Sequence, residues 1–253
     1  MLCIHSTIDR QAAICASARL IRGAKHLTAF TGAGISVASG IPPFRGPGGL
    51  WNKYDPRLLE IRYFLERPEV SWPVLKEIFY DHFGAARPNR AHEVLAAWEA
   101  RGLLRALVTQ NIDNLHFEAG SRNVVEFHGN SRTLVCLACS ARRPATPGVL
   151  ETLPPRCACG GLLKPDIVFF GEGIRRDATE GADAAADRTD CMLVVGSTGE
   201  VYPAAHVPRR AKQHGATLIE INPEPSEFTA DADVRVALSA SEAFDLLEKE
   251  LSG

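Results

Sequence analysis

Four cysteines in the sequence have the spacing of a metal site. They form two pairs, Cys136-x-x-Cys139 and Cys157-x-Cys159, which residues 140–156 separate. Two such turns can converge on one tetrahedral ion, and four thiolates without a nearby histidine leave no coordination position for water. The pattern predicts a structural Zn²⁺ site, with two redox pairs as the alternative. The single residue between Cys157 and Cys159 leaves the geometry of the second turn open.

One histidine is placed where it could act as a general base. His128 directly follows the apolar run 124–127 and precedes Gly129. Its imidazole is therefore expected at the exit of a strand, on the edge where parallel sheets bind their ligands. The pKa of an imidazole in water lies near 6.5, so the ring can accept a proton at neutral pH. A lone histidine is more often structural, and position alone leaves both roles open.

A glycine-rich turn follows the first apolar run. Residues 27–31 lead directly into Gly32-Ala33-Gly34-Ile35-Ser36, and two glycines there would let the backbone approach a pyrophosphate. The match to the dinucleotide-binding motif is incomplete, because Val37 occupies the position of its third glycine. A Gly/Pro-rich stretch, 41–56, also replaces the strand that would carry the ribose-binding acid. These departures argue against an ordinary dehydrogenase and leave a plain tight turn as the alternative.

Polar groups follow three further apolar runs in the same way. Amide, carboxylate and hydroxyl groups at several strand exits suit ribose and phosphate oxygens, although each group could instead cap a helix. The residues concerned are Gln110-Asn111-Ile112-Asp113 after 104–108, Gly196-Ser197-Thr198 after 192–195, and Asn222 after 217–221.

The elements that would position these groups alternate along the chain. Six apolar runs have the length and composition of buried parallel strands, at 27–31, 104–108, 124–127, 192–196, 217–221 and 234–238. Helical spacing of apolar residues lies between most of them, for example at Ala91, Val94, Leu95 and Trp98. This alternation predicts an α/β fold with helices on both faces of a mostly parallel sheet. Residues 130–166, which hold the cysteine cluster and several prolines, interrupt the alternation as a small inserted module.

Composition limits the class of protein. The 253 residues carry 28 basic and 30 acidic side chains, which argues against direct nucleic-acid binding through bulk positive charge. No run approaches the roughly 20 apolar residues of a membrane span, so no membrane association is expected. Residues 1–23 favour a first helix over a transit peptide. Three scattered cysteines, Cys3, Cys15 and Cys191, are expected in the core, and seven cysteines without a secretion signal favour a reducing, cytoplasmic location.

Together the motifs resemble those of the sirtuins, a family of NAD-dependent protein-lysine deacylases. The resemblance is of the bacterial type and spans nearly the whole chain. The motifs occur in the family's order and are Gly32-Ala33-Gly34-Ile35-Ser36, Ser39-Gly40-Ile41-Pro42, Phe44-Arg45-Gly46, Thr109-Gln110-Asn111-Ile112-Asp113, His128-Gly129, the four cysteines, Phe170-Gly171-Glu172, Gly196-Ser197-Thr198 and Ile221-Asn222-Pro223.

The resemblance implies a fold and an activity. It implies a Rossmann-like NAD-binding domain formed by residues 1–129 and 167–253, and a small zinc-binding domain formed by residues 130–166 with a helical part at about 41–90. The acyl group of a protein lysine would pass to ADP-ribose as nicotinamide leaves, in the cleft between the domains. The chain is expected to be a monomer whose partners are acyl-lysine proteins.

The resemblance also implies roles for individual residues. His128 is the catalytic base, and Asn111 is catalytic as well as cofactor-binding. The cofactor site is expected to comprise Gly32, Ala33, Gly34, Ser36, Ile41, Phe44, Arg45, Trp51, Gln110, Asn111, Ile112, Asp113, Gly196, Ser197, Thr198 and Asn222. The substrate site is expected to comprise Tyr80, Phe83, Val168, Phe170, Gly171, Glu172, Val201 and Tyr202, with the peptide added as a strand.

One departure from the family bears on the acyl group. The chain is most similar to a subgroup that removes succinyl groups with a Tyr and an Arg three residues later, and here Tyr80 is kept while Phe83 replaces the Arg. A succinyl carboxylate would lose its bidentate partner, so we expect neutral acyl groups to be preferred, with Arg87 or Arg90 as poorly placed substitutes. Two other functions remain as alternatives, a protein mono-ADP-ribosyltransferase and a non-catalytic NAD-sensing protein.

Overall fold

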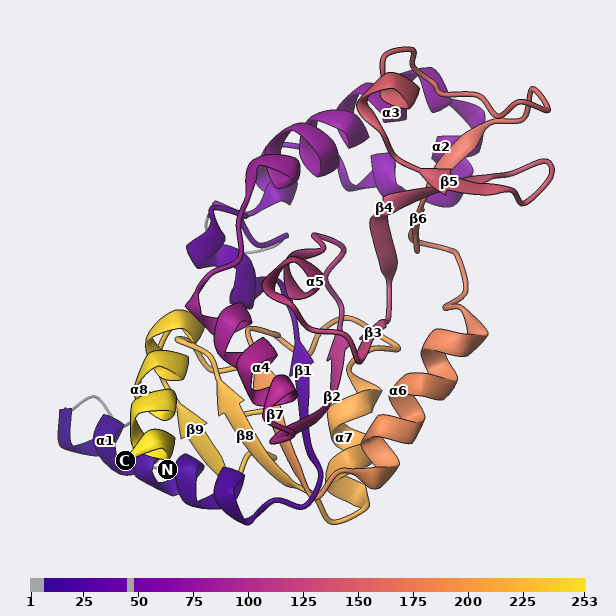
Figure 1. Cartoon of the computed structure of the whole chain (residues 1–253). Coiled ribbons are helices and arrows are strands. Elements are labelled where there is room, and N and C mark those ends of the chain that lie inside the picture. The colour runs from indigo at the N-terminus through magenta and orange to yellow at the C-terminus, as the bar shows by residue number, and fades with distance from the viewer. Residues whose placement is uncertain (1–6, 45–47) are drawn as a thin grey trace.

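The computed structural model describes residues 7–44 and 48–253, and it describes side chains from Arg10 onward. The expectations for Cys3 and Arg45 therefore concern residues outside the described part of the chain. Two sheets form the framework, one of six strands and one of three. Figure 1 shows the larger sheet with its helices at one end of the molecule and the smaller sheet, with α2 and α3, at the other.

The large sheet is parallel throughout and has the strand order β3-β2-β1-β7-β8-β9. Its central strands are buried along their whole length, as their continuous apolar runs predict. Four predicted strands end one or two residues from the observed carboxyl ends, and β7 also begins one residue earlier than predicted. Gly196, for example, leaves the strand with a φ of 60°. The strands are β1 Leu27–Thr31, β2 Leu104–Thr109, β3 Val124–Glu126, β7 Cys191–Val195, β8 Thr217–Ile221 and β9 Val234–Val236.

Helices cover both faces of this sheet, which confirms the predicted α/β layering. Alternate residues of each strand face opposite layers, so Ala29 packs in the cluster that contains α1, α4 and α8, while Phe30 packs in the cluster that contains α6 and α7. Asn89 caps α4 and Ser239 caps α8 through their side chains. These helices are α1 Thr7–Gly23, α4 Arg90–Ala100, α6 Arg176–Arg188, α7 His206–Gln213 and α8 Ala240–Ser252.

We call the part of the molecule formed by residues 61–82 and the smaller sheet the small lobe. The sequence did not predict this antiparallel sheet. Its order is β5-β4-β6, with β4 at Gly129–Cys136, β5 at Arg142–Pro144 and β6 at Leu163–Ile167. Charged and proline residues in β5 and β6 hide the strand pattern. The short helices α2, Ile61–Glu66, and α3, Pro68–Lys76, followed by a π-helical turn at Glu77–His82, pack against this sheet.

One apolar cluster unites the small lobe. Trp72 and Leu75 of α3 pack in it with Leu134 of β4, Leu163 of β6 and Phe169. The indole nitrogen of Trp72 donates a hydrogen bond to the carbonyl oxygen of Leu163 at 3.0 Å, so the helical segment is also tied to β6 by a polar contact. None of the helices in the described residues has both the length and the hydrophobicity that crossing a membrane requires.

Of the two scattered cysteines within the described residues, Cys191 is buried as expected and Cys15 is half-buried. Cys191 begins strand β7, and burial raises the pKa of its thiol to about 12. The buried thiol is therefore protonated at neutral pH and acts as a small apolar group.

Candidate functional site

The carboxyl ends of the parallel strands bring the predicted polar residues to one edge of the large sheet. Strand β1 ends at Thr31, β2 at Thr109 and β7 at Val195. Adjacent parallel strands end together, so residues far apart in the chain meet there. The amide nitrogen of Gly32 donates to the carbonyl oxygen of Val195 at 2.9 Å, and that of Gln110 donates to the carbonyl oxygen of Thr31 at 2.9 Å.

Three glycines let the turn after β1 and the turn after β7 come into direct backbone contact at this edge. A Cβ on Gly34 would lie 2.6 Å from the Cα of Gly196, and a Cβ on Gly196 would lie 2.4 Å from the amide nitrogen of Ile35. A Cβ on Gly32 would lie 2.8 Å from the carbonyl oxygen of Gly196. Only glycine fits these positions, because the turn after β1 packs directly on the turn after β7. Such a bare backbone cradle fits the pyrophosphate of a dinucleotide.

Ser197 connects three strand exits beside this cradle. Its hydroxyl accepts a hydrogen bond from Nε2 of Gln110 at 2.9 Å, and its carbonyl oxygen accepts one from Nδ2 of Asn222 at 3.3 Å. Thr198 lies next to it, with its carbonyl oxygen bonded to the amide of Glu227 at 3.0 Å. The structure therefore brings together the groups that the sequence assigned to ribose and phosphate oxygens.

A buried network joins the turn after β1 to the turn after β2. Ser36 donates to Oδ2 of Asp113 at 2.7 Å, and Nδ2 of Asn111 donates both to Ser36 Oγ and to the carbonyl oxygen of Gly32, each at 3.2 Å. All three side chains are less than a tenth exposed. Burial raises the pKa of the Asp113 carboxyl, while the Ser36 hydroxyl and the amide of Leu115 oppose the rise by donating to it.

Two buried histidines beneath this network were not predicted from the sequence. Nε2 of His92 lies 3.5 Å from Ser36 Oγ, and the rings of His92 and His116 meet edge to face with centroids 4.9 Å apart. Nε2 of His116 lies 2.9 Å from Thr31 Oγ1. Burial lowers the pKa of His92 to about 4 and lowers that of His116 well below its usual range, so both rings are neutral. A histidine at N3 of α4, one turn before the buried residues Leu95 and Ala96, was the available signal.

His128 lies at the exit of β3, as predicted, and its ring is oriented by the neighbouring strand. Nδ1 of His128 lies 3.0 Å from the carbonyl oxygen of Gln110, which can only accept, so Nδ1 carries the proton. Nε2 is then the basic nitrogen of the neutral ring. Burial lowers the pKa of His128, and the hydrogen bond to Gln110 opposes this effect. The ring is therefore present as a base at neutral pH.

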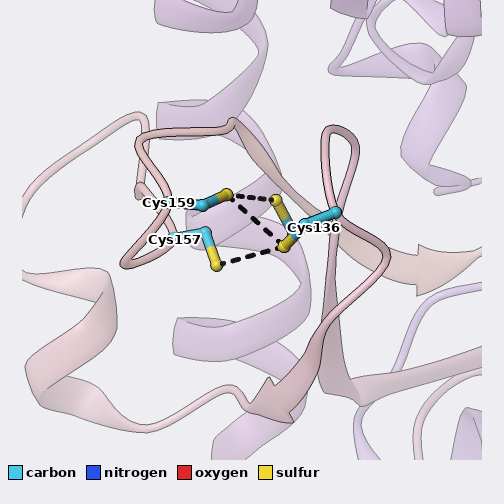
Figure 2. Close-up of side chains that lie close together, drawn as sticks. Cys136, Cys157 and Cys159 are labelled. Carbon is cyan, nitrogen blue, oxygen red and sulfur yellow. Dashed lines mark hydrogen bonds between the residues drawn. The ribbon is translucent and has the colours of Figure 1, made fainter.

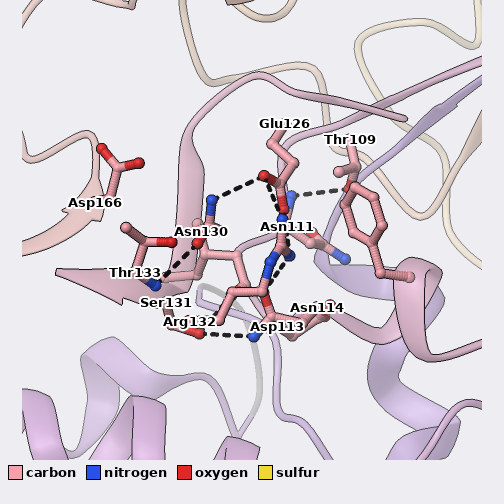
Figure 3. A network of polar contacts seen from close by, with 12 residues as sticks. Thr109, Asn111, Asp113, Asn114, Glu126, Asn130, Ser131, Arg132, Thr133 and Asp166 are labelled. Carbon is pink, nitrogen blue, oxygen red and sulfur yellow. Dashed lines mark hydrogen bonds and ion pairs between the residues drawn. The ribbon is translucent and has the colours of Figure 1, made fainter. Parts of the chain in front are cut away.

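A polar contact braces the chain on both sides of His128. Arg132 of β4 makes a two-pronged ion pair with Glu126 of β3, with N···O distances of 2.7 and 2.9 Å, and Nδ2 of Asn130 donates to the same carboxylate at 2.9 Å. Figure 3 shows these side chains converging between the two strands. Because Arg132 also donates to Oδ1 of Asn114 at 2.8 Å, the brace ties the start of the small lobe to the large sheet.

An apolar pocket lies between the strand exits and the helical segment. Asn111 and Asp113 share a cavity of about 10 Å³ with Ala33 and with the apolar side chains of Ile41, Phe44, Phe83 and Ile112. Trp51 packs on Phe44 with ring centroids 5.4 Å apart and on Phe170 with centroids 6.3 Å apart. The lining chemistry, apolar walls beside a buried amide and carboxylate, suits a flat aromatic ring bearing an amide, such as nicotinamide, but the walls must separate to admit it, because a cavity of about 10 Å³ holds no more than one water.

The residues assigned to the substrate fall into three groups: residues 168–172, Val201-Tyr202, and Tyr80 with Phe83 in the apolar cluster of the small lobe. Phe170 and Tyr202 are 46% and 56% exposed, a high value for aromatic side chains. The backbone of Phe170 is bonded to Leu59 and Ile61, and the carboxylate of Glu172 is bonded to Lys164. Tyr80 stacks on Trp72, with ring centroids 6.4 Å apart, and burial raises the pKa of its hydroxyl. Val168 and Gly171 belong to the Phe170 segment, and Val201 precedes Tyr202.

The four cysteines converge at the tip of the small lobe, as the spacing predicts. Their sulfur atoms all lie within 4.8 Å of one another. The separations include 3.5 Å for Cys136 and Cys159 and 3.8 Å for Cys139 and Cys157, close to the roughly 3.8 Å edge of a tetrahedron with 2.3 Å Zn–S bonds. Figure 2 shows the sulfur atoms facing one another from two turns. The tetrad is therefore positioned to hold zinc.

The second cysteine turn depends on a glycine. A Cβ on Gly161 would lie 2.7 Å from the sulfur of Cys136 and 3.3 Å from that of Cys159. The amide of Cys157 donates to the carbonyl oxygen of Gly161 at 2.8 Å, which closes the turn despite the single residue between Cys157 and Cys159. The tight spacing is thus compatible with four converging ligands.

The chain is similar to known proteins in sequence and in fold. The model of the Sir2 family matches residues 32–203. An NAD-dependent protein deacetylase of Caldivirga maquilingensis is 45% identical over 94% of this chain and 93% of its own length, and NAD-dependent protein deacylase 2 of Pyrobaculum aerophilum is 44% identical over 92% and 94%. A Sir2 complex with a deacetylated p53 peptide and 3′-O-acetyl ADP-ribose superimposes with a TM-score of 0.88, at 35% identity, over 93% of this chain and 97% of that one.

Proposed function

The chain belongs to the Sir2 family, and from that premise we propose that it removes acyl groups from protein lysines with NAD as co-substrate. The single observation that carries the proposal is the orientation of His128, whose Nδ1–H binds the Gln110 carbonyl and whose Nε2 is left basic at the sheet edge. A protein that only bound NAD would have no need of such a base.

NAD supplies the ADP-ribose that accepts the acyl group when nicotinamide leaves. The glycine cradle of Gly32, Gly34 and Gly196 would admit the pyrophosphate, and Ser197 and Asn222 would hold the adenosine side. Asp113 and Asn111, anchored through Ser36, would orient nicotinamide within the apolar walls. Those walls exclude water, which limits simple hydrolysis of the cofactor.

His128 would remove a proton from a ribose hydroxyl. Its Nδ1–H remains bonded to Gln110, and this contact stabilises the ring as it gains positive charge. The zinc would take no part in bond making, because four thiolates complete its coordination. Its contribution would be to hold together the two turns that carry the cysteines.

We further propose that neutral acyl groups are preferred over succinyl groups. Phe83 is 5% exposed and lines the pocket that contains Asn111 and Asp113, where a carboxylate would meet an apolar ring. The two substitute cations are engaged elsewhere. Nη1 of Arg87 donates to the carbonyl oxygen of Ala86 at 2.8 Å, and Arg90 pairs with Asp245 at 3.4 Å.

We also propose a compartment, an oligomeric state, a class of partner and a domain division for this chain. We place the chain in a reducing, cytoplasmic compartment, as a monomer without direct nucleic-acid binding. Its partners would be proteins that carry acyl-lysine. The two-domain division at residues 129/130 and 166/167 is proposed on the same basis, since the antiparallel sheet begins and ends near these positions.

The function is tested by incubating the zinc-loaded protein with NAD and acetyl- and succinyl-lysine peptides, and by following nicotinamide and acyl-ADP-ribose. Both products should form in equal amounts, and only when acyl peptide is present. Label from NAD that stays on protein without acyl-ADP-ribose would identify an ADP-ribosyltransferase. NAD binding without nicotinamide release would identify a sensing protein.

A further inference from the structure

A buried lysine lies beneath the segment that follows strand β6. The side chain of Lys164 is 8% exposed. Its Nζ donates to the carbonyl oxygens of Ile167 and Pro165, at 2.6 and 3.2 Å, and to Oε2 of Glu172 at 2.9 Å. These three acceptors match the three N–H donors of an ammonium group, which is costly to bury without such partners. Burial lowers the pKa of Lys164, and the Glu172 carboxylate opposes this effect.

The same pair of side chains fixes Phe169 between them. Nζ of Lys164 lies 4.3 Å from the centroid of the Phe169 ring, and Oε2 of Glu172 accepts the amide N–H of Phe169 at 2.8 Å. The ring itself is 1% exposed and packs edge to face on Phe64, with centroids 5.1 Å apart. Backbone and side chain of Phe169 are therefore held by one ion pair.

The residues on either side of Phe169 reach the site. The amide of Val168 donates to the carbonyl oxygen of His128 at 2.9 Å. The amide of Phe170 donates to the carbonyl oxygen of Leu59 at 2.8 Å, and its carbonyl oxygen accepts from Ile61 at 3.0 Å, which leaves the Phe170 ring exposed. A displacement of Phe169 would therefore move both the backbone of the base and the exposed aromatic residue.

We propose that Lys164 and Glu172 are a positioning pair, which shapes residues 168–171 as the template for the acyl-lysine peptide and fixes that template relative to His128. The inference rests on the proposed deacylase function and adds to it a role for two side chains that face away from the peptide. Glu172 thereby acts through Phe169 rather than on the substrate.

The location of the pair favours positioning over a purely stabilising role. An apolar pair of similar volume is often as stabilising as a buried ion pair, whereas an ion pair with fixed acceptors specifies one conformation. Lys164 pairs across the sheet with Val135, next to Cys136, so the template is also coupled to the metal-bearing strand. The pair thus connects residues 168–171 to strand β4, which carries Cys136.

The experiment compares four variants of the full, zinc-loaded chain. Lys164→Met removes the ammonium, Glu172→Ala removes the acceptor of the Phe169 amide, and Glu172→Gln keeps an acceptor while removing the charge. Arg176→Met is the matched control, because it breaks the exposed ion pair with Glu180 on α6. The readouts are KM for an acetyl-lysine peptide, KM for NAD, and hydrogen exchange of the amides of residues 168–172.

We expect Lys164→Met and Glu172→Ala to raise KM for the peptide by about tenfold while KM for NAD stays within about twofold. Glu172→Gln should recover part of the loss, and Arg176→Met should match the wild type. The Phe169 amide should exchange faster in the first two variants. Equal rises in the two KM values, or an unchanged peptide KM, would overturn the proposal.

Two outcomes separate this inference from the proposed function. If the wild type shows no deacylation, the proposed function fails, and the exchange of the Phe169 amide still tests the pair, since an unchanged rate contradicts it. If Lys164→Met does not fold, Glu172→Ala decides in its place, because it removes the acceptor of the Phe169 amide. An unaltered peptide KM and exchange rate in that variant would then overturn the proposal.

Discussion

Nδ1 of His128 lies 3.0 Å from the carbonyl oxygen of Gln110, so the exit of strand β2 orients the ring that follows strand β3. This contact determines which nitrogen carries the proton and leaves Nε2 as the base. The two residues are 18 positions apart and meet because β2 and β3 pair in parallel, with Thr109 opposite Glu126. The first predictions concern this relationship.

Replacing His128 by Ala should lower kcat/KM for deacylation by about 10²- to 10⁴-fold, because the reaction loses its general base. NAD binding should change little, since the glycine cradle and Ser197 are untouched. Product formation by chromatography and NAD binding by calorimetry measure the two effects. His214→Ala is the control, because His214 lies beyond α7 and pairs with the surface residue Asp187. Activity retained in His128→Ala would refute the assigned role.

The value of kcat/KM for deacylation should rise with pH through a pKa below 6.5. Burial favours the neutral form of His128 and lowers its pKa, and the neutral ring is the active form. Protonation at lower pH therefore removes the base, while the rate stays level from this pKa up to neutral pH. A profile of kcat/KM between pH 5 and 8 measures the pKa. A rising limb centred above pH 7 would contradict the assignment of this limb to His128.

Deacetylation should be faster than desuccinylation on the same peptide. The pocket wall at Phe83 offers no guanidinium to the succinyl carboxylate, and the cost of burying an unpaired charge opposes its binding. We expect kcat/KM for deacetylation to exceed kcat/KM for desuccinylation by about tenfold or more. The two rates are compared on peptides that differ only in the acyl group. Faster desuccinylation would show that another cation reaches the pocket.

The free energy of unfolding should fall as the pH drops from about 6.5 to about 4. His92 is neutral in the fold with a pKa of about 4, whereas the unfolded chain binds the proton near pH 6.5. The unfolded state therefore gains protons first, and stability is lost through this window, by on the order of 3 kcal/mol for His92. His116 acts in the same direction, and the raised pKa of Asp113 acts in the opposite one.

Urea unfolding at pH 7 and at pH 4.5 measures this loss. His92→Gln removes the titrating ring and should reduce the difference between the two pH values, even if it lowers stability at both. Gln213→Ala, at an exposed position of α7 without a titrating group, should leave the difference unchanged. An equal pH dependence in wild type and His92→Gln would show that other groups cause the acid sensitivity.

Chelation of zinc should unfold the small lobe before the large sheet. Cys136 lies in β4 opposite Leu163 of β6, so loss of the metal frees both strands that carry the apolar cluster. Cys136→Ser should have the same effect, and Cys15→Ser in α1 is the control. Thermal unfolding monitored by circular dichroism, with zinc content measured in parallel, should show two transitions. A single unchanged transition after complete metal removal would argue against a structural role.

The large sheet could be predicted from local pattern. Strands such as β7, at Cys191–Val195, are buried on both faces and therefore appear as continuous apolar runs, and the helices between them have helical spacing. The cysteine tetrad was equally readable, because ligand spacing within a turn is a local property. Sheet β5-β4-β6 was not predicted, since β5 consists of Arg142, Arg143 and Pro144, and β6 contains Lys164 and Asp166.

Residue types at the strand exits, including the glycines and His128, were determined by the sequence, because they follow local apolar runs directly. Only the tertiary structure decided which of them meet and in what state. Three features depend on residues that lie 8 to 24 positions apart and that sheet register and packing bring together. They are the contact of His128 with Gln110, the buried contact of His92 with His116, and the pairing of Lys164 with Glu172. The protonation of these side chains depends on how far the fold excludes water from them, and this burial cannot be inferred from a short stretch of sequence.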